Sequence, residues 1–266
     1  MTSNGMKTLI CGNGWIGKIL KDFLDADISQ ERIQNIKPAT VKKYDVVINC
    51  AGKTNIDWCE KNKSEALAVN AIYAGELARV CKKLGKKYVY LSSACIFESM
   101  SANDWKDEYS APNPGCFYSL TKVIGEHLVR EACPEALVIR IRLPISKNPH
   151  PRNTLTKILG YQILHTNQET VTVVEDMLPV LKKLIQKGEK GIFHLVNKDT
   201  ISPFQMRASL GKGDFKAITK KKLDEAILRA GRAKRVSTLV RSTRIPALPS
   251  IRSRMPEIAR AYKENL

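Results

Sequence analysis

Ser93, Tyr118 and Lys122 are the residues of this sequence whose types and spacing could do chemistry together. Tyr118 and Lys122 are four positions apart, so a helix would place both side chains on one face. An ammonium beside a phenol favours the phenolate and lowers the pKa of a tyrosine from about 10, so Tyr118 could exchange a proton with a carbonyl or an alcohol. Ser93 could donate a hydrogen bond to the same oxygen. For the tyrosine–lysine pair alone, the alternative is a solvated helix face.

A glycine-rich turn lies near the start of the chain, between an apolar run at 7–11 and a helical pattern. Gly12 would permit the tight turn, Gly14 would let the backbone approach a pyrophosphate, and Gly17 would let the helix pack closely on the strand. The positive end of the helix dipole would then face the phosphates. An ordinary strand–helix turn is the alternative. The residues expected to hold a dinucleotide here are Gly12, Gly14, Trp15, Ile16 and Gly17.

Strand-like and helical patterns alternate up to residue 145. Such repeats predict an α/β fold with a Rossmann-type, doubly wound parallel sheet. We expect a dinucleotide-binding domain at 1–145 and a smaller substrate-binding lobe at 146–266, interleaved with the core. Ligands of such sheets lie beyond the carboxyl ends of strands. Further cofactor-binding positions expected there are Ala51, Gly52, Lys53 and Pro144. We also expect Tyr118 and Lys122, on a helix, to contact the cofactor.

The region after the first helix departs from the usual pattern. An acidic residue that binds the ribose is expected about 20 residues past the glycine turn, at the end of a second strand. Here the helix runs almost directly into Asp27 and Ile28, and no clear second strand is visible. Asp27 and Ile28 are therefore the expected cofactor contacts, and the choice between NAD and NADP stays open.

Composition limits the class of protein. The chain has 266 residues, a formal charge of +18 and 43% hydrophobic residues, which excludes a disordered, collagen-like or disulfide-stapled chain. No apolar run is long enough to span a membrane, and the first residues do not resemble a secretory signal, so we expect a cytoplasmic location. Seven cysteines without a Cys-x-x-Cys pair and four scattered histidines predict no metal site.

Positive charge is concentrated near the end of the sequence. Residues 201–266 contain 16 Lys and Arg against 5 Asp and Glu. This surplus could attract nucleic acid, but no nucleic-acid motif accompanies it. We expect a solvated basic face, or a surface that attracts a phosphorylated substrate.

Together, the glycine turn, Ser93, Tyr118 and Lys122 resemble the extended short-chain dehydrogenase/reductase family. A narrower resemblance extends to about residue 209 and is to the nucleotide-rhamnose synthases of plants. The dTDP-4-dehydrorhamnose reductases and GDP-fucose synthases are similar but more distant. The runs that carry it include NIDWCE at 55–60, ACIFE at 94–98, RIRLPIS at 140–146 and PRN at 151–153.

The resemblance implies a 3,5-epimerase/4-reductase that converts a UDP- or dTDP-linked 4-keto-6-deoxyhexose to a nucleotide-linked L-rhamnose. It implies NADPH or NADH as cofactor, with NADP favoured, and a homodimer. Tyr118 would be the acid/base, Lys122 would bind the ribose hydroxyls and the tyrosine, and Ser93 would bind the substrate oxygen. The substrate-binding residues expected are Asn55, Phe97, Arg152 and Asn153.

The same resemblance makes Cys95 and Lys157 the acid/base pair for epimerisation. In a 4-keto sugar the protons on C3 and C5 are acidic because their removal gives an enolate. A cysteine needs a nearby cation to ionise near neutrality, and a lysine needs partial burial or a neighbouring cation to lose its proton there.

Three alternatives remain open. Cys95 could be a core thiol and Lys157 a solvent-facing lysine, which would leave a 4-reductase only. The chain could instead be a non-catalytic, cofactor-binding partner subunit, although intact Ser93, Tyr118 and Lys122 argue against this. Nucleic-acid binding is the third.

Overall fold

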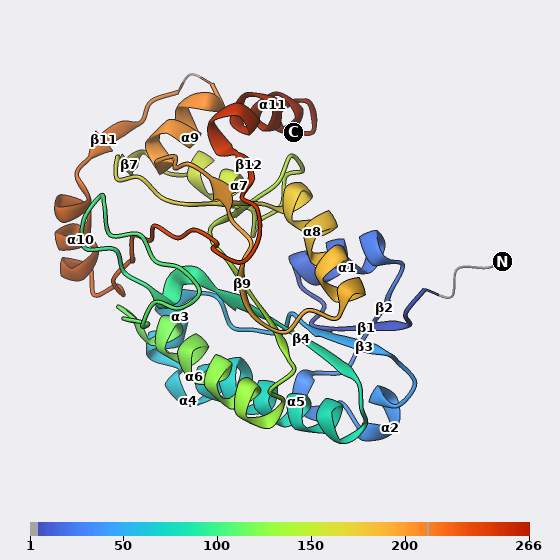
Figure 1. Ribbon diagram of the computed structural model, residues 1–266. Helices are drawn as coiled ribbons and strands as arrows, with labels where there is room; N and C mark the ends of the chain where they lie inside the picture. The colour runs from blue at the N-terminus through green and yellow to red at the C-terminus, as the bar shows by residue number, and fades with distance from the viewer. Residues whose placement is uncertain (1–4, 212) are drawn as a thin grey trace. The chain divides into compact units, whose positions relative to one another are not determined.

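The computed structural model describes residues 5–211 and 213–266 (Figure 1). The elements of the first half are β1 (Thr8–Cys11), α1 (Trp15–Leu24), β2 (Asp27–Ile28), η1 (Ile33–Asn35), α2 (Pro38–Val41), β3 (Val46–Asn49), α3 (Ile56–Lys61), α4 (Lys63–Leu67), η2 (Ala68–Ile72), α5 (Tyr73–Lys83), β4 (Lys87–Ser93), η3 (Ala94–Ile96), α6 (Phe117–Ala132) and β5 (Leu137–Ile141). They are followed by β6 (Pro144–Ile145), α7 (Thr154–Leu159), β7 (Ile163–His165), β8 (Thr172–Val173), α8 (Val174–Lys187), β9 (Gly191–His194), β10 (Asn197–Lys198), α9 (Pro203–Ser209), β11 (Lys216–Ile218), α10 (Lys220–Arg229), β12 (Leu248–Ser250) and α11 (Ile251–Glu264). Within the described ranges, no helix has the length and apolar character needed to cross a membrane.

The chain divides into two compact units, each built from three separate segments. Unit 1 is Met1–Ser93, Phe117–Ile139 and Leu181–Phe193, and unit 2 is Ala94–Cys116, Arg140–Val180 and His194–Leu266. The chain passes from one unit to the other within β5, α8 and β9. The assignment of a dinucleotide-binding domain to 1–145 and of an interleaved substrate-binding lobe to 146–266 stays a prediction.

A six-stranded sheet has the strand order β2-β1-β3-β4-β5-β9. The pairs β1–β2, β1–β3 and β3–β4 are parallel. All four residues of β1 and of β3 are buried, as expected for strands covered on both faces. The strand order reverses beside β1, and ligands of open α/β sheets bind at such a switch point.

Helices cover both faces of the sheet in unit 1 (Figure 1). On one face, α5 and α6 approach closely because Gly75 has no side chain: a Cβ there would lie 2.9 Å from the Leu128 Cβ. On the other face lie α1 and the second half of α8, where Lys182 Nζ is 5.7 Å from the centre of the Phe23 ring. The predicted α/β fold with a doubly wound parallel sheet is confirmed.

Unit 2 has its own hydrophobic core. Buried side chains of α7, α9 and α11 pack together, among them Leu155, Met206 and Tyr262. Short parallel pairs β6–β8, β7–β11 and β10–β12 surround this core. The Tyr262 hydroxyl lies 2.7 Å from Thr156 Oγ1, so α11 is joined to α7 by a hydrogen bond as well as by packing.

Candidate active site

The glycine-rich turn joins β1 to α1 in unit 1. Gly12 has a φ of +115°, and a Cβ on it would lie 2.5 Å from the Ala51 nitrogen. A Cβ on Gly17 would collide with the Gly12 carbonyl oxygen. The fold itself therefore requires both glycines.

Gly14 differs from the other two glycines of the turn. Its backbone is extended, with φ −92° and ψ −174°, and no atom lies within 4 Å of where its Cβ would be. The N-cap residue of α1 is Gly14 itself, which has no side chain to cap the helix, and the first residues Trp15 and Ile16 are half-buried. A helix N-terminus with open space at Gly14 suits an anionic group such as a pyrophosphate.

A second strand follows α1 after all. Asp27 pairs with Leu9 and Ile28 pairs with Ile10, in parallel. The strand was missed because it has two residues only, and Asp25 in the left-handed conformation (φ 51°) turns the chain back at once. Burial raises the pKa of the Tyr44 hydroxyl, and its hydrogen bond to the Asp27 carboxylate adds to the effect.

Two asparagines hold the backbone after β3. The Ala51 N–H donates to Asn49 Oδ1 (3.0 Å). Asn70 contacts Lys53 twice: its Oδ1 accepts from the Lys53 N–H (2.7 Å) and its Nδ2 donates to the Lys53 carbonyl (3.0 Å). Gly52 lies between Ala51 and Lys53, and these hydrogen bonds fix the segment 51–53 at the carboxyl end of the sheet.

Tyr118 and Lys122 lie one turn apart on α6, and both are buried in unit 1. Ser93, the last residue of β4, is also buried. The first N–H group of α6, that of Phe117, donates to the Glu60 carboxylate (2.7 Å). Glu60, from the NIDWCE run, thus fixes the start of the helix that carries the tyrosine.

Lys122 is 4% exposed, and its ammonium has identified partners. It donates to the Tyr90 hydroxyl oxygen (2.8 Å) and to the Leu91 carbonyl (2.9 Å). Burial lowers the pKa of Lys122 from 10.5 to about 8, although the Glu126 carboxylate opposes this shift. The lysine is therefore held in place by β4.

Tyr90 continues this chain of contacts. Its hydroxyl donates to the Asn70 carbonyl oxygen (2.6 Å). Asn70 lies in η2, a π-helical turn before α5, and such turns are frequent at functional sites. The Asn70 side chain also donates to Thr121 Oγ1 (3.0 Å), next to Lys122 in sequence. Glu126, one turn beyond Lys122, accepts a hydrogen bond from Ser92.

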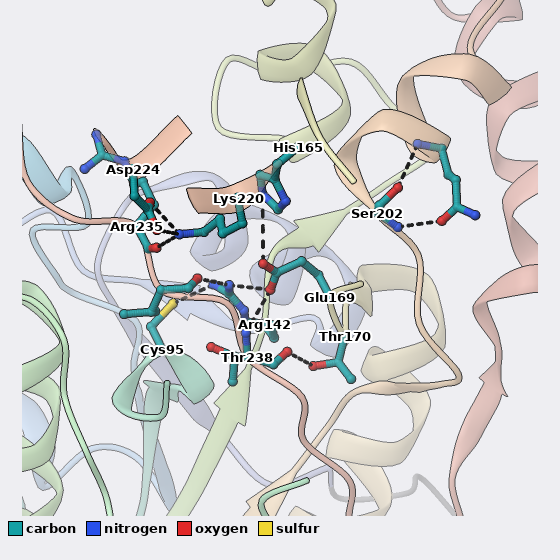
Figure 2. A network of polar contacts seen from close by, with 12 residues as sticks. Cys95, Arg142, His165, Glu169, Thr170, Ser202, Lys220, Asp224, Arg235 and Thr238 are labelled. Atoms are coloured by element: carbon teal, nitrogen blue, oxygen red, sulfur yellow. Dashed lines mark hydrogen bonds and ion pairs between the residues drawn. The ribbon is translucent and has the colours of Figure 1, made fainter. Parts of the chain in front are cut away.

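Cys95 belongs to unit 2 and lies in η3. It is half-buried, and Arg142 Nη1 donates to its sulfur (2.9 Å). Arg142 in turn forms an ion pair with Glu169 (2.7 Å). Figure 2 shows this line of contacts running from Cys95 through Arg142 to Glu169 and on towards His165.

Lys157 also belongs to unit 2, on α7. Its side chain reaches the surface, but partial burial of the ammonium and the positive charge of Arg152 lower its pKa below 10.5. Asn153 is fully buried and caps α7 by accepting from the Leu155 N–H (3.0 Å). Its Nδ2 donates to the Ser146 and Asn148 carbonyls, so Asn153 fixes the loop that leads to Lys157.

The remaining predicted site residues have local structural partners. Asn55 caps α3 by accepting from the Trp58 N–H (3.0 Å). The Phe97 side chain is fully buried, with the Arg140 guanidinium 5.2 Å from its ring centre. Pro144 begins β6 directly after Leu143, a residue with φ +36°. Their roles in binding stay predictions.

Sequence reasoning missed several residues that position the predicted ones. They are Glu60, Asn70, Tyr90, Glu126, Arg142 and Glu169. One signal could have found one of them: Glu126 follows Lys122 by four residues on one helix, which places both side chains on the same face. Arg142 and Glu169 act through long-range contacts that no local pattern reveals.

Comparisons with known proteins place the chain in a family. A trifunctional UDP-glucose 4,6-dehydratase/UDP-4-keto-6-deoxy-D-glucose 3,5-epimerase/UDP-4-keto-L-rhamnose-reductase of Arabidopsis thaliana is 31% identical, over 74% of this chain and 32% of that protein. The chain thus spans about a third of this relative's length. A bifunctional dTDP-4-dehydrorhamnose 3,5-epimerase/dTDP-4-dehydrorhamnose reductase of the same plant is 29% identical, over 76% of this chain and 73% of that protein.

Among solved structures, the UDP-rhamnose synthase of Acanthamoeba polyphaga mimivirus is similar over 97% of this chain and all of its own, with a TM-score of 0.86 and 25% identity. Residues 20–239 match the family described as the RmlD substrate binding domain. These findings confirm the resemblance inferred from the motifs. The chain belongs to the RmlD substrate-binding-domain family.

Proposed function

We propose that this protein reduces the C4 ketone of a UDP- or dTDP-linked 4-keto-6-deoxyhexose with hydride from NADPH or NADH, after epimerising C3 and C5. The observation that carries the reductase part is the buried Lys122 ammonium, one helical turn from Tyr118 and in the same unit as the glycine turn. The similarity to reductases and synthases of rhamnose nucleotides supports the class of substrate.

The residues around the glycine turn fit a dinucleotide. The open space at Gly14 and the N-terminus of α1, whose N-cap residue is a glycine, suit a pyrophosphate, and the backbone at 51–53 is fixed by Asn49 and Asn70. When bound, a dihydronicotinamide supplies the hydride that the reduction needs.

Gly14→Ala tests this fit. An added methyl meets no protein atom, so stability should change by about 0.5 kcal/mol or less. The methyl would keep a pyrophosphate from at least one helix N–H group, so we expect the dissociation constants of NADPH and NADH to rise about tenfold or more. Fluorescence titration measures this. Unchanged affinity for both cofactors would show that no pyrophosphate lies at Gly14. Gly17→Ala is the contrasting variant, since it should lower the melting temperature.

The protein's own groups complete the reduction. As hydride reaches C4, the carbonyl oxygen gains charge, and Tyr118 gives it a proton. Ser93 donates a hydrogen bond to that oxygen, and the Lys122 ammonium stabilises the phenolate left on Tyr118. Glu60 and Tyr90 serve this chemistry by fixing the start of α6 and the lysine.

Epimerisation would use Cys95 and Lys157. A thiolate removes the proton next to the ketone, the C–H electron pair moves into the enolate, and an ammonium returns a proton to the opposite face of that carbon. The cation beside the Cys95 sulfur and the lowered pKa of Lys157 support these roles.

Cys95→Ser separates epimerisation from reduction. UDP- and dTDP-linked 4-keto-6-deoxyglucose are incubated in deuterated water with each cofactor, and products are analysed by proton NMR and mass spectrometry. The intact protein should place deuterium at C3 and C5. Cys95→Ser should lose about a hundredfold or more of this exchange, because a general base is removed, but should still reduce a pre-epimerised substrate. Exchange at the parent rate in Cys95→Ser would exclude Cys95 as the base and would show that other residues catalyse the exchange.

A further inference from the structure

The Arg142 side chain is buried in unit 2, with 5% of its surface exposed. Its guanidinium has three hydrogen-bond acceptors: Cys95 Sγ at 2.9 Å from Nη1, and Glu169 Oε2 and the Val236 carbonyl, each at 2.7 Å from Nη2. A guanidinium has no acceptor, so the sulfur must accept in this contact. A thiolate sulfur accepts such a hydrogen bond more strongly than a thiol sulfur does.

Arg142 is fixed through its backbone, and its partner Glu169 is fixed as well. The Arg142 N–H donates to Thr172 Oγ1 (3.0 Å), and the Thr172 N–H donates back to the Arg142 carbonyl (2.7 Å). Glu169 is held in turn, because its Oε2 also accepts from the Thr238 N–H (3.0 Å). Glu169 pairs through its backbone with Ile201. The arginine therefore has little freedom to leave Cys95.

The other charged groups near this cluster are already paired or uncharged. Lys220 forms an ion pair with Asp224 (2.5 Å) and donates to the Arg235 carbonyl (Figure 2). His165 Nε2 is 4.0 Å from Glu169 Oε1, and burial lowers the pKa of His165, which keeps the ring neutral near pH 7. Burial opposes the charge on Arg142, but Cys95 and Glu169 more than offset this and raise the pKa of its guanidinium.

Two opposite effects thus act on the Cys95 sulfur. Arg142 touches it and favours the thiolate, whereas the Glu169 carboxylate, on the far side of the guanidinium, disfavours a second negative charge. Glu169 also holds the arginine in place. The guanidinium is the nearer of the two charges, since it contacts the sulfur directly.

We infer that Arg142 is the positioning residue that makes Cys95 usable as a base: anchored by Glu169 and the Val236 carbonyl, it donates a hydrogen bond that stabilises the Cys95 thiolate. This inference rests on the epimerase function proposed above. Removal of a proton from carbon converts the thiolate to a thiol and the sugar to an enolate, and Arg142 keeps its own protons throughout.

Alkylation of Cys95 tests this role without requiring turnover. The full-length protein is treated with iodoacetamide from pH 5 to 10, and the Cys95 peptide is quantified by mass spectrometry. Three proteins are compared: wild type, Glu169→Gln and Arg142→Met/Glu169→Gln. The last two differ only at residue 142, and neither leaves a buried carboxylate without its partner.

At pH 7 we expect Glu169→Gln to react fastest, wild type next and the double variant slowest. The first and last should differ about tenfold or more, the effect of one hydrogen bond to a charged group. The advantage of Glu169→Gln over the double variant should disappear at high pH, where Cys95 is ionised in all three proteins. A role in packing alone would change access to Cys95 equally at every pH. Equal rates at pH 7 for Glu169→Gln and the double variant would overturn the inference.

Two controls accompany the series. Cys116, also half-buried and in unit 2, is quantified in the same digests and should react equally in all variants. Lys106→Met/Asp104→Asn removes another ion pair of unit 2 (2.7 Å) and should leave Cys95 alkylation unchanged. If Glu169→Gln does not fold, Arg142→Lys replaces it. Arg142 reaches Cys95 from Nη1 and Glu169 from Nη2, and a lysine has a single nitrogen on a shorter side chain. We expect that nitrogen to stay with Glu169, so alkylation of Cys95 at pH 7 should fall, and an unchanged rate contradicts the proposal.

The outcome is independent of the test of epimerisation. If Arg142 controls Cys95 alkylation but Cys95→Ser still exchanges deuterium, the thiolate exists and the proposed role of Cys95 as the epimerisation base fails. If Cys95→Ser loses deuterium exchange but the rate of Cys95 alkylation does not depend on residue 142, the proposed function stands and the proposed role of Arg142 is wrong.

Discussion

Replacing Lys122 by Met is expected to make the protein both nearly inactive and more stable. The buried ammonium has a pKa of about 8 instead of 10.5, so keeping it charged at pH 7 costs up to about 3 kcal/mol of folding free energy. Methionine removes this cost, although the hydrogen bonds to Tyr90 and Leu91 are lost too. Reduction should fall about a hundredfold or more, because no cation then stabilises the phenolate.

The sign of the pH effect follows from the lowered pKa. Below about pH 8 the folded and unfolded chains both carry the charge, and the full cost is present. Between about 8 and 10.5 the unfolded chain binds more protons, so the wild type gains stability as pH rises. Urea unfolding at pH 7 and pH 10 should therefore show a difference between Lys122→Met and wild type that shrinks at the higher pH.

Lys83→Met is the matched control for this substitution. Lys83 is exposed near the end of α5, and its replacement should change stability by about 0.5 kcal/mol or less and leave reduction intact. A Lys122→Met protein that is less stable than wild type at pH 7 would show that the two hydrogen bonds outweigh the buried charge.

Tyr118→Phe should lower the rate of carbonyl reduction about a thousandfold, within the range for loss of a general acid. The change removes one oxygen from a buried side chain, and the contact of Thr121 Oγ1 with the Tyr118 carbonyl (2.7 Å) does not depend on it. Folding and cofactor affinity should therefore be kept. Single-turnover oxidation of NADPH with a pre-epimerised substrate measures the effect.

Tyr109→Phe serves as the control for Tyr118→Phe. Tyr109 is 79% exposed in unit 2, so its hydroxyl should be dispensable. A Tyr118→Phe protein that reduces the substrate within about threefold of the parent rate would remove Tyr118 from the proton transfer, since a general acid contributes far more than this.

Local patterns predicted most of the sheet in unit 1. The run at 7–11, the three glycines and the following helix are set by neighbours in sequence, and they form β1 and α1 as expected. β2 could not be seen, since two residues give no measurable periodicity. Local patterns do not mark the points where the chain passes between the two units, because α8 and the strands β5 and β9 look continuous in sequence while their packing partners change midway.

Local spacing predicted one pair of site residues in unit 1, whereas the other contacts of the site join residues that are far apart in the sequence. Tyr118 and Lys122 are linked by helical spacing, which is a local property. The partners of Lys122 are Tyr90 and Leu91, some thirty residues away, and they depend on how β4 packs against α6. The contacts of Cys95 with Arg142, and of Arg142 with Glu169, span 47 and 27 residues. Spacing in sequence carries no information about such pairs.

The alternation of the two units along the chain has a consequence for biosynthesis. Nascent domains generally fold as units during translation, starting from the N-terminus. Unit 1 cannot be completed until Leu181–Phe193 has been synthesised, and unit 2 must wait for His194–Leu266. Neither unit can be obtained as an uninterrupted fragment, and a ribosome that stalls before residue 181 would leave apolar surface of unit 1 uncovered and open to chaperones.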